Sequence, residues 1–486
     1  MVDSVNFQKD NLHLIIGAGP AGLTAAYELT RLGVPVVVVE QDREVGGLAR
    51  TVEYRGFRFD IGGHRFFTKN VQVRELWQKL LGDDLLTRPR LSRIFYGGTY
   101  FDYPLRPLNA LKGLGVTASL AVLCSYLWRK VVPIKPEDSF AAWVTNRFGD
   151  KLYRMFFESY TEKVWGIPCR TISAEWAAQR IQGLSLRTAI VAMFFPVRHT
   201  TGGGAIKTLI DEFSYPRLGP GMMWDALRNT VENQGGRVVT NTRVETVCYD
   251  GTAITGVTVV EGGVQRLCPV SHLISTMPLR TLIRSLLPPA PENVIAAAGR
   301  LRYRDFLTVA LIVKVPDLFP DNWIYVHDPK VSVGRIQNFK NWSPDMVPDP
   351  KLTCLGMEYF CNENDQLWSM TDSELVHLAA RELAAIGITR EVLVSDGVVV
   401  RMPKAYPVYD EEYPQAVATI REYLDRFVNL QVVGRNGMHR YNNMDHSMLT
   451  GMMAVQNLSG GKHDLWAINA DDEYHEIDNE HANQEW

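Results

Sequence analysis

Two short apolar runs near the start of the chain flank a glycine-rich turn and a helical pattern. Leu12–Ile16 is mostly apolar, and Val36–Val39 is a second run of the buried-strand type. Between them lie the turn Gly17–Gly22 and a run of good helix formers, Leu23–Leu32, which ends at Gly33. Strand, glycine turn, helix and strand in this order predict the opening of a Rossmann-type unit.

Farther along, the alternation of apolar and polar residues changes character twice. From about Asn70 to Tyr215 it is mostly helical, with Trp and Phe at irregular helical spacing, which predicts an inserted helical subdomain. From about Arg302 to Val400 it alternates as strands do, which predicts an antiparallel sheet. The polar tail after Asn469 is expected to be disordered. The individual strands predicted after the opening are Val238–Thr240, Arg243–Val247, Ile254–Val260, His272–Ser275, Phe306–Val313, Trp323–Val326, Leu352–Phe360 and Val392–Val400.

The glycine turn has the spacing of a dinucleotide-binding site. Gly17 would permit the tight turn, Gly19 would let the backbone approach a pyrophosphate, and Gly22 would pack helix on strand. The helix N-terminus offers free N–H groups to phosphates, and Glu40 ends the second strand where an acid accepts ribose hydroxyls. Glycine turns also serve ordinary loops, but the strand–turn–helix context favours a cofactor site. The contacts predicted here are Gly17, Gly19, Pro20, Ala21, Gly22 and Glu40.

A second glycine pair follows Glu40 closely and selects the cofactor. Gly46-Gly47-Leu48-Ala49-Arg50 resembles the GG motif of amine oxidase and glutathione-reductase-type flavoproteins. In that motif the glycines bring a second loop against the pyrophosphate and ribityl chain, and an arginine neutralises phosphate. The alternative is a generic glycine turn with a solvated arginine. Bound FAD is therefore predicted, with further contacts from Gly47, Leu48, Ala49 and Arg50.

With the cofactor assigned, the chain divides into six expected segments, all part of an α/β fold. A Rossmann-type FAD-binding domain carries an inserted helical subdomain and an antiparallel-sheet domain on the substrate side. The segments are 1–69 (FAD-binding), 70–215 (mostly helical substrate or cap subdomain), 216–300 (FAD-binding, continued), 301–400 (antiparallel-sheet substrate domain), 401–468 (FAD-binding, C-terminal) and 469–486 (polar tail).

Composition narrows the class of protein further. The net charge of −3 lacks the basic excess of a nucleic-acid binder. The six cysteines are scattered without a CxxC pair, so neither a zinc site nor a disulfide framework is indicated, and a reducing, cytoplasmic setting is expected. No signal peptide is recognised at the N-terminus. The apolar stretch Val116–Trp128 is interrupted by Thr, Ser and Cys and falls short of the ~20 residues of a membrane span, which leaves a peripheral membrane contact open. Homo-oligomer formation also stays open.

Several later segments carry a longer signal. They are Asp60–Phe67, which contains a Gly-Gly-His loop; Arg90–Ser92 with Tyr103 and Pro104; Lys163–Pro168 with Trp176 and Arg180; Trp323–Tyr325 with Arg335 and Asn341–Pro344; and Gly434–Gly437 with Tyr441 and Asp445–Ser447. Together, and in this order over most of the chain, they resemble the UDP-galactopyranose mutases, particularly the eukaryotic type.

The sequence also departs from that family's pattern. Trp342 stands where the family has a tyrosine, the linker from Tyr441 to Asp445 is shorter than expected, and Met444 replaces a polar residue. These positions are expected near flavin and substrate, so the sugar, and even the mutase reaction, stay open.

The resemblance implies a flavin-dependent sugar-nucleotide mutase acting on a UDP-hexose. In that reaction N5 of the reduced flavin attacks the anomeric carbon and displaces UDP, the sugar ring opens through an iminium and recloses at the other ring size, and UDP returns. No net redox change occurs, so NAD(P)H would serve only to reduce the flavin, received by Arg90, Ser92, Tyr103 and Tyr325.

Two other functions share this fold. One is an FAD-dependent oxidoreductase of the amine oxidase, protoporphyrinogen oxidase or desaturase type. The other is a non-catalytic lipid-escort protein like the Rab GDP-dissociation inhibitors, against which the intact glycines and Glu40 argue. No nucleophile–base pair or HExxH motif stands out, as expected where the cofactor carries the chemistry.

The resemblance assigns roles to individual residues, each with a plainer alternative. Arg335 and Arg435 suit diphosphate oxygens because guanidinium presents a rigid fork, although surface arginines are commoner. His64 would steer the flavin ring or simply bond to a backbone carbonyl, and Asp445 would contact the cofactor or serve as a helix N-cap. The predicted catalytic residues are His64, Arg335 and Arg435. Further predicted cofactor contacts are Gly62, Gly63, His64, Val244, Gly434, Arg435, Asp445, His446 and Ser447. Predicted substrate contacts are Arg90, Tyr103, Trp165, Arg180, Trp323, Tyr325, Arg335, Tyr406, Arg435 and Tyr441, of which the tyrosines and tryptophans could equally be core residues.

Overall fold

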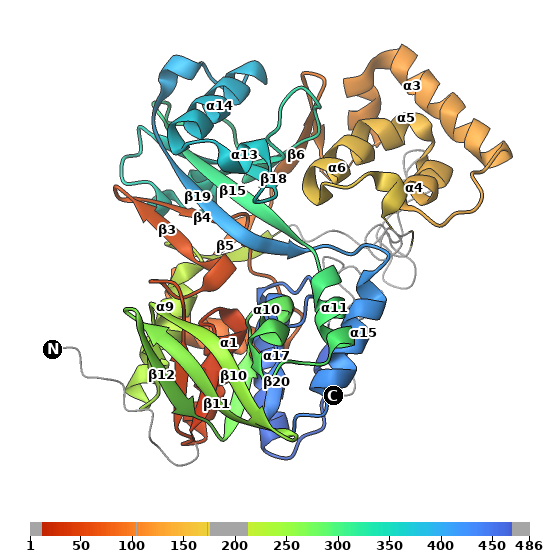
Figure 1. Ribbon diagram of the computed structural model, residues 1–486. Coiled ribbons are helices and arrows are strands. Elements are labelled where there is room, and N and C mark those ends of the chain that lie inside the picture. The colour runs from red at the N-terminus through yellow and green to blue at the C-terminus, as the bar shows by residue number, and fades with distance from the viewer. Residues whose placement is uncertain (1–11, 104, 106, 173, 175–211, 469–486) are drawn as a thin grey trace, which may run out of the picture.

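A five-stranded parallel sheet forms the base of the molecule (Figure 1). The computed structural model describes residues 12–103, 105, 107–172, 174 and 212–468. The sheet has the order β20-β13-β1-β2-β9, with every neighbouring pair parallel. Consecutive β-branched residues suit a strand buried on both faces, and the four valines of β2 are all buried. The strands are β1 (His13–Ile16), β2 (Val36–Val39), β9 (Arg237–Val239), β13 (His272–Ser275) and β20 (Leu430–Val432).

Helices and a smaller sheet cover the two faces of this parallel sheet. One face carries α1 (Pro20–Arg31), α9 (Gly221–Asn233) and α17 (Met444–Leu458), which share a core with Ile15 and Val38. The opposite face carries a four-stranded sheet and three helices around a second core. This arrangement confirms the predicted Rossmann-type domain. The second group comprises β10 (Thr242–Asp250), β11 (Ala253–Glu261), β12 (Val264–Pro269), β14 (Leu286–Leu287), α10 (Leu279–Ser285), α11 (Glu292–Arg300) and α15 (Tyr413–Leu424).

A seven-stranded sheet lies above the Rossmann-type domain (Figure 1). Its order is β19-β15-β18-β17-β16-β6-β7, antiparallel throughout except where β16 pairs with β6. One face packs against α14 (Asp372–Ala385), and two strands, β6 and β7, come from the 70–215 segment. The strands are β6 (Ser92–Tyr96), β7 (Thr99–Asp102), β15 (Tyr303–Val313), β16 (Trp323–Val326), β17 (Arg335–Asn338), β18 (Thr353–Cys361) and β19 (Val394–Pro407).

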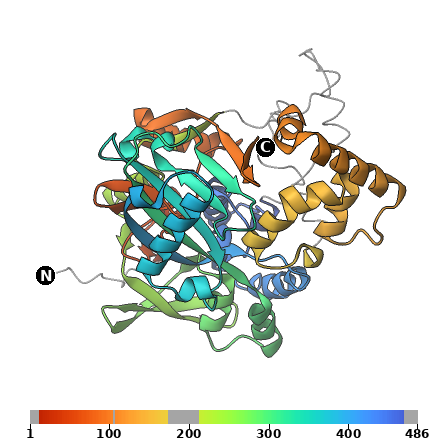
Figure 2. The same ribbon diagram turned by 90° about the horizontal axis from the view of Figure 1, so that it is seen from above.

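A helical subdomain projects to one side of both sheets (Figures 1 and 2). It contains α3 (Pro107–Val131), which is kinked at Gly115, and α4 (Phe140–Phe148), α5 (Asp150–Leu152) and α6 (Ser159–Trp165). Among the described residues, none of the helices combines the length and apolar character needed to cross a bilayer. The remaining elements are β3 (Thr51–Tyr54), β4 (Phe57–Asp60), α2 (Val71–Leu81), β5 (Leu85–Pro89), β8 (Glu212–Pro216), α12 (Phe339–Trp342), α13 (Gln366–Ser369), α16 (Gly434–Gly437) and short 3-10 and π turns.

Candidate functional site

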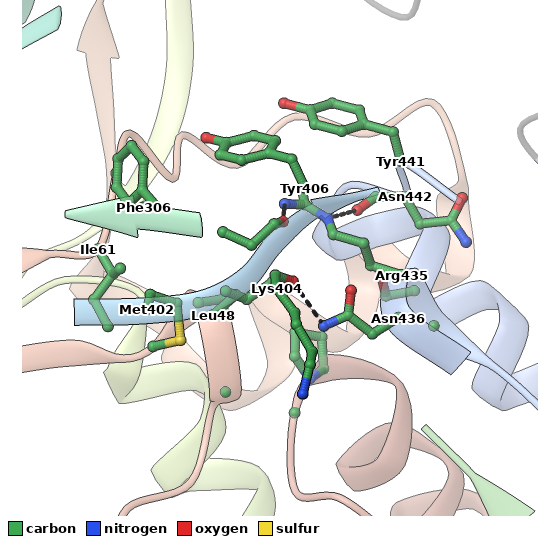
Figure 3. Close-up of a pocket in the computed structure, with 18 of the residues that line it drawn as sticks. Leu48, Ile61, Phe306, Met402, Lys404, Tyr406, Arg435, Asn436, Tyr441 and Asn442 are labelled. Atoms are coloured by element: carbon green, nitrogen blue, oxygen red, sulfur yellow. Dashed lines mark hydrogen bonds between the residues drawn. The ribbon is translucent and has the colours of Figure 1, made fainter. Parts of the chain in front are cut away.

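A cavity of 1210 Å³ lies between the parallel sheet and the seven-stranded sheet. Its wall joins the glycine turn after β1, the Gly-Gly-His loop, the end of β19 and the first turn of α17. Figure 3 shows part of this wall, with Met402, Lys404 and Tyr406 of β19 and Arg435 and Asn436 of α16. Segments that are hundreds of residues apart in the sequence therefore meet in one space. Most of the predicted site residues line it: Gly17, Gly19, Pro20, Ala21, Glu40, Gly47, Leu48, Ala49, Arg50, Gly62, Gly63, His64, Tyr103, Trp165, Val244, Trp323, Tyr325, Arg335, Tyr406, Gly434, Arg435, Tyr441, Asp445, His446 and Ser447.

The three glycines of the first turn differ in what surrounds them. Gly17 has a φ of +96°, and a Cβ there would lie 2.0 Å from Thr276 Oγ1. A Cβ on Gly22 would lie 1.9 Å from the Gly17 carbonyl oxygen, because helix and strand are in contact there. Around Gly19, by contrast, no heavy atom of the described chain lies within 4 Å of that position, and the residue faces the cavity. The packing thus leaves room at the one glycine where a pyrophosphate would approach.

The second glycine loop closes against the first. A Cβ on Gly47 would lie 3.5 Å from Gly19 Cα, so the two backbones bound one narrow part of the cavity. Arg50 Nη1 donates to the Gly47 carbonyl at 3.1 Å and lies 3.4 Å from Asp42 Oδ2. This guanidinium lines the cavity with its position already fixed, as phosphate neutralisation requires.

Glu40 sits at the end of β2 with its carboxylate held by backbone groups. Its Oε2 accepts the Ala18 N–H at 2.7 Å, and its Oε1 accepts the Asp42 N–H at 2.9 Å. Burial raises the pKa of Glu40, whereas the backbone N–H groups lower it. Each carboxylate oxygen has a second lone pair, so both are able to accept from ribose hydroxyls as well.

The Gly-Gly-His loop brings His64 under the seven-stranded sheet. Gly62 has a φ of +100°, and a Cβ on Gly63 would lie 2.8 Å from Gln337 Nε2, so both positions favour glycine. Burial, with Arg435 and then Arg335 nearby, lowers the pKa of His64 to about 3. The imidazole is therefore neutral at physiological pH, and its buried Nδ1 has no hydrogen-bond partner within the described part of the chain.

Arg335 is anchored by a buried carboxylate on the neighbouring strand. Arg335 and Glu358 are direct partners in the β17–β18 pairing, and Arg335 Nε donates to Glu358 Oε2 at 2.5 Å. Gln337, two residues along β17, donates to the other Glu358 oxygen at 2.8 Å. Burial opposes the charge on Arg335, but Glu358 outweighs it and holds the arginine pKa above its usual value. The guanidinium is thus fixed in orientation and charged.

Arg435 reaches the cavity from the opposite, Rossmann side and is held differently (Figure 3). Its Nε donates to the Asn442 carbonyl at 2.9 Å and its Nη1 to the Ala405 carbonyl at 3.2 Å. Within the described ranges, no carboxylate is close enough to form an ion pair with it. Its guanidinium lies over the ring of Tyr441, 4.6 Å from the centroid. Arg435 therefore presents a positioned charge that forms no ion pair with any described carboxylate.

Aromatic hydroxyl groups surround the two arginines. Tyr406 and Tyr441 stack with ring centroids 5.7 Å apart, and burial raises the pKa of Tyr406 well above its usual range. On the other side, the ring centroid of Tyr325 lies 4.9 Å from that of Tyr103 and 5.6 Å from that of Tyr160. Phenol hydroxyls such as these donate hydrogen bonds to an anion.

Not every predicted contact reaches the cavity. Gly22 is buried between helix and strand, and Ser92 is buried in β6 beside Trp323. Arg90 lies behind the wall, 5.5 Å from the Tyr103 ring centroid and 5.6 Å from that of Trp323. The predicted substrate contact Arg180, and Trp176 of the same motif, fall outside the described residues.

The start of α17 excludes one of the two roles predicted for Asp445. The helix begins at Met444 with Asn443 as its N-cap, and the Asn443 N–H donates to His446 Nδ1 at 3.4 Å. The reading of Asp445 as an N-cap was wrong, because this residue already belongs to the first turn. Asp445 is buried and lines the cavity with His446 and Ser447.

The cavity also contains residues that sequence reasoning missed. Tyr160, Gln337 and Thr276 all line it. Gln337 could have been found, because a residue two positions after Arg335 on a strand shares its face. Thr276 follows directly after β13, at the carboxyl edge where Rossmann-type sheets bind ligands. No sequence signal distinguished Tyr160 from a core tyrosine. Among the described residues, His, Cys, Asp and Glu form no cluster suited to a metal ion.

Known structures share this architecture. A reduced UDP-galactopyranose mutase superimposes with a TM-score of 0.80 at 22% identity, over 94% of this chain and 97% of the mutase. A wild-type putrescine oxidase bound to putrescine superimposes with a TM-score of 0.62 at 16% identity, over 93% and 99% of the two chains. Identities this low show similarity of fold.

Similarity to curated proteins is local in sequence. A segment of 58 residues is 56% identical to the inactive all-trans-retinol 13,14-reductase of Danio rerio, covering 12% of this chain and 10% of that protein. The sequence profile of the flavin containing amine oxidoreductases, in contrast, matches residues 20–457. With its parallel-sheet cofactor domain and glycine-lined cavity, the chain belongs to the flavin containing amine oxidoreductase family, whose members are FAD-dependent enzymes.

Proposed function

We propose that this enzyme is a flavin-dependent sugar-nucleotide mutase that interconverts the ring forms of a UDP-hexose. The observation that carries the proposal is the pair of fixed guanidiniums, Arg335 and Arg435, which face one cavity from the two opposing domains. Two arginines with tyrosine hydroxyls around them suit a diphosphate. Each guanidinium can donate two parallel, charge-assisted hydrogen bonds to phosphate oxygens.

The charge of the substrate-side wall supports this function over amine oxidation. In the described structure, the strands of the seven-stranded sheet contribute Arg335, Arg401 and Lys404 to the cavity lining and no acidic side chain. Arg401 is paired with Asp372, which does not line the cavity, and Asp410 lines it just beyond the end of β19. The nearby Glu358 is fully buried and already bound by Arg335 and Gln337. Such a wall attracts an anion and repels a protonated amine. An oxidoreductase of the same family acting on a neutral or anionic substrate is the alternative.

The cavity is suited to FAD on its own geometry. The open space at Gly19, the N-terminus of the 12-residue helix α1 and the backbone-held Glu40 provide for pyrophosphate and ribose. The first turn of α17 and the Gly62–His64 loop would contact the ring system. Reduced FAD, when bound, would supply the nucleophile for exchange at the anomeric carbon.

The chain's own residues would bind and orient the substrate. Arg335 and Arg435 would hold the diphosphate before and after it leaves the sugar, and tyrosines such as Tyr406 would donate neutral hydrogen bonds to it. His64, neutral and with Nδ1 unsatisfied within the described chain, would bond to the ring system without adding a positive charge. Trp342 occupies the position of the family's tyrosine, and its Nε1 donates to the Asn322 carbonyl at 2.9 Å, so it would shape the pocket and not bind phosphate.

NAD(P)H is proposed as the reductant that readies the flavin. Tyr103 and Tyr325 line the cavity, with Arg90 just behind them. Mixing NADPH or NADH with the oxidised enzyme in the absence of oxygen should bleach the flavin absorbance. An enzyme reduced only by dithionite would remove NAD(P)H from the proposal and leave the mutase reaction standing.

Binding of UDP tests the proposal. Titration of oxidised and reduced enzyme with UDP, followed by flavin fluorescence and calorimetry, should show saturable binding at one site, with UMP binding more weakly because one phosphate is missing. Binding of UDP to neither redox form would overturn the mutase function and leave the oxidoreductase alternative.

A further inference from the structure

Helix α3 carries an apolar surface on the side that faces away from the molecule. Val116, Leu120, Leu123, Leu127 and Val131 recur every three or four residues, which places them on one face of the helix. All are exposed, and Trp128 beside them is 60% exposed. We define Val116, Leu120, Leu123, Leu127, Trp128 and Val131 as the α3 stripe.

The inward face of the same helix is already packed against the protein core. Val122 is buried in a core that includes Phe140 and Phe148 of α4, and Tyr126 is buried as well. In both views α3 forms the outer edge of the helical subdomain (Figures 1 and 2), and its N-terminal part also packs on β7. The α3 stripe is therefore not the core-facing side of an ordinary surface helix, which has one apolar face. It is a second apolar face, and contiguous exposed apolar surface marks an interaction site.

The charges around the stripe indicate what covers it. Between Asp102 and Glu137 the sequence has no acidic residue, and its basic residues are Arg106, Lys112, Arg129, Lys130 and Lys135. Arg129 is paired with Asp150 at 2.7 Å. Of the four other basic residues, Lys112, Lys130 and Lys135 lie among the described residues and carry a local excess of positive charge. Lys130 Nζ lies 5.2 Å from the Tyr126 ring centroid, at the end of the helix that bears Trp128. A basic rim around leucines and an interfacial tryptophan is the composition of a helix that lies in a bilayer surface.

We propose that the α3 stripe docks on a membrane surface containing anionic phospholipids. The leucines and Trp128 would enter the boundary between headgroups and acyl chains, while the lysines would contact lipid phosphates. A second copy of this chain fits less well, because helices packed face to face would bring the same lysines together. The docking is independent of the proposed reaction and positions the whole enzyme at a membrane.

Vesicle binding by the intact, FAD-loaded protein tests this proposal. The protein should sediment with vesicles of phosphatidylcholine and phosphatidylglycerol in equal parts, and much less with phosphatidylcholine alone. High salt should weaken the association because surface charges are screened. Equal binding to both kinds of vesicle, or binding to neither, would overturn the proposal.

Variants locate the contact. Leu120→Glu with Leu127→Glu should lower the vesicle partition coefficient about tenfold or more, because two apolar side chains are lost from the boundary. Leu267→Glu is the matched control, since Leu267 is similarly exposed on β12, far along the chain from α3. Lys112→Gln with Lys135→Gln should weaken binding roughly fivefold for each charge removed. Flavin absorbance and the melting temperature should stay unchanged in all three, since the side chains are exposed.

A fluorescent label at Cys124, the exposed cysteine of the six, reports on the same face. The emission of an environment-sensitive dye there should shift to shorter wavelength when anionic vesicles are added. It should not shift when the protein concentration is raised without vesicles. If the protein instead dimerises in solution, and Leu120→Glu with Leu127→Glu makes it monomeric without changing vesicle binding, the stripe is a dimer interface and the membrane proposal is wrong.

Discussion

The two ends of the cavity are built in different ways. The cofactor end is formed by two short sequence motifs, each continuous in the chain. The backbones of Gly19 in the first motif and Gly47 in the second lie close together. The substrate end is assembled from side chains on separate strands and loops, such as Arg335 on β17 and Arg435 after β20. Backbone shape defines the first end, and side-chain charge defines the second. Changes at one end should therefore spare the other.

The largest effect is expected from filling the space at Gly19. Gly19→Val would place a branched side chain where the pyrophosphate approaches, so the purified protein should lose its flavin absorbance entirely. Gly299→Val is the control, because Gly299 in α11 has equally open surroundings but lies away from the cavity. If Gly19→Val retains FAD as the parent does, the cofactor is placed wrongly.

Removing Arg335 should cost both substrate affinity and stability. Arg335→Ala should raise the dissociation constant for UDP about tenfold to a hundredfold, since a charge-assisted hydrogen bond contributes roughly 1.5–3 kcal/mol. It also leaves the buried Glu358 without its cation, which should lower the free energy of unfolding by about 3–5 kcal/mol. Denaturant titration and calorimetry measure the two effects. Adding Glu358→Gln should recover stability but not UDP binding, which separates fold from function.

Arg435→Ala should weaken UDP binding by a similar factor of about ten to a hundred, with a smaller loss of stability. The difference arises because Arg435 is held by the Asn442 and Ala405 carbonyls and no buried carboxylate is abandoned. Arg435→Lys should rescue binding only in part, because lysine lacks the fork. Parent-like UDP binding by both alanine variants would mean that the diphosphate binds elsewhere.

The smallest effect is a pH dependence of stability set by Asp60 at the end of β4. Burial raises the pKa of Asp60 to about 7, although Tyr215 and Thr51 donate hydrogen bonds to it. Because the folded pKa lies above the unfolded value, the folded state holds the proton more tightly. This contribution is present below pH 4 and is lost as the pH rises to about 7. When the melting temperature is plotted against pH across this range, the slope should be shallower for Asp60→Asn than for the parent protein. An unchanged slope would show that Asp60 does not titrate there.

The same division explains what the sequence could predict. The glycine turn, Glu40 and the strand His272–Ser275 were predicted at their observed places because each depends on neighbours in the chain. The seven-stranded sheet was predicted from 301–400, but β6 and β7 join it through the parallel β6–β16 pairing, which periodicity cannot reveal. Glu358 was not singled out, because its partnership with Arg335 exists only once β17 and β18 pair in register. Long-range pairing, and not local preference, determines the substrate end.

Ring isomerisation by the reduced enzyme tests the central claim most directly. Dithionite-reduced protein, kept free of oxygen, is incubated with UDP-hexoses, and the products are resolved by chromatography. The account predicts interconversion of pyranose and furanose forms of one UDP-hexose, no turnover by oxidised enzyme, and no consumption of reductant in proportion to product. Oxygen uptake with substrate, without a ring isomer from any UDP-hexose, would contradict it.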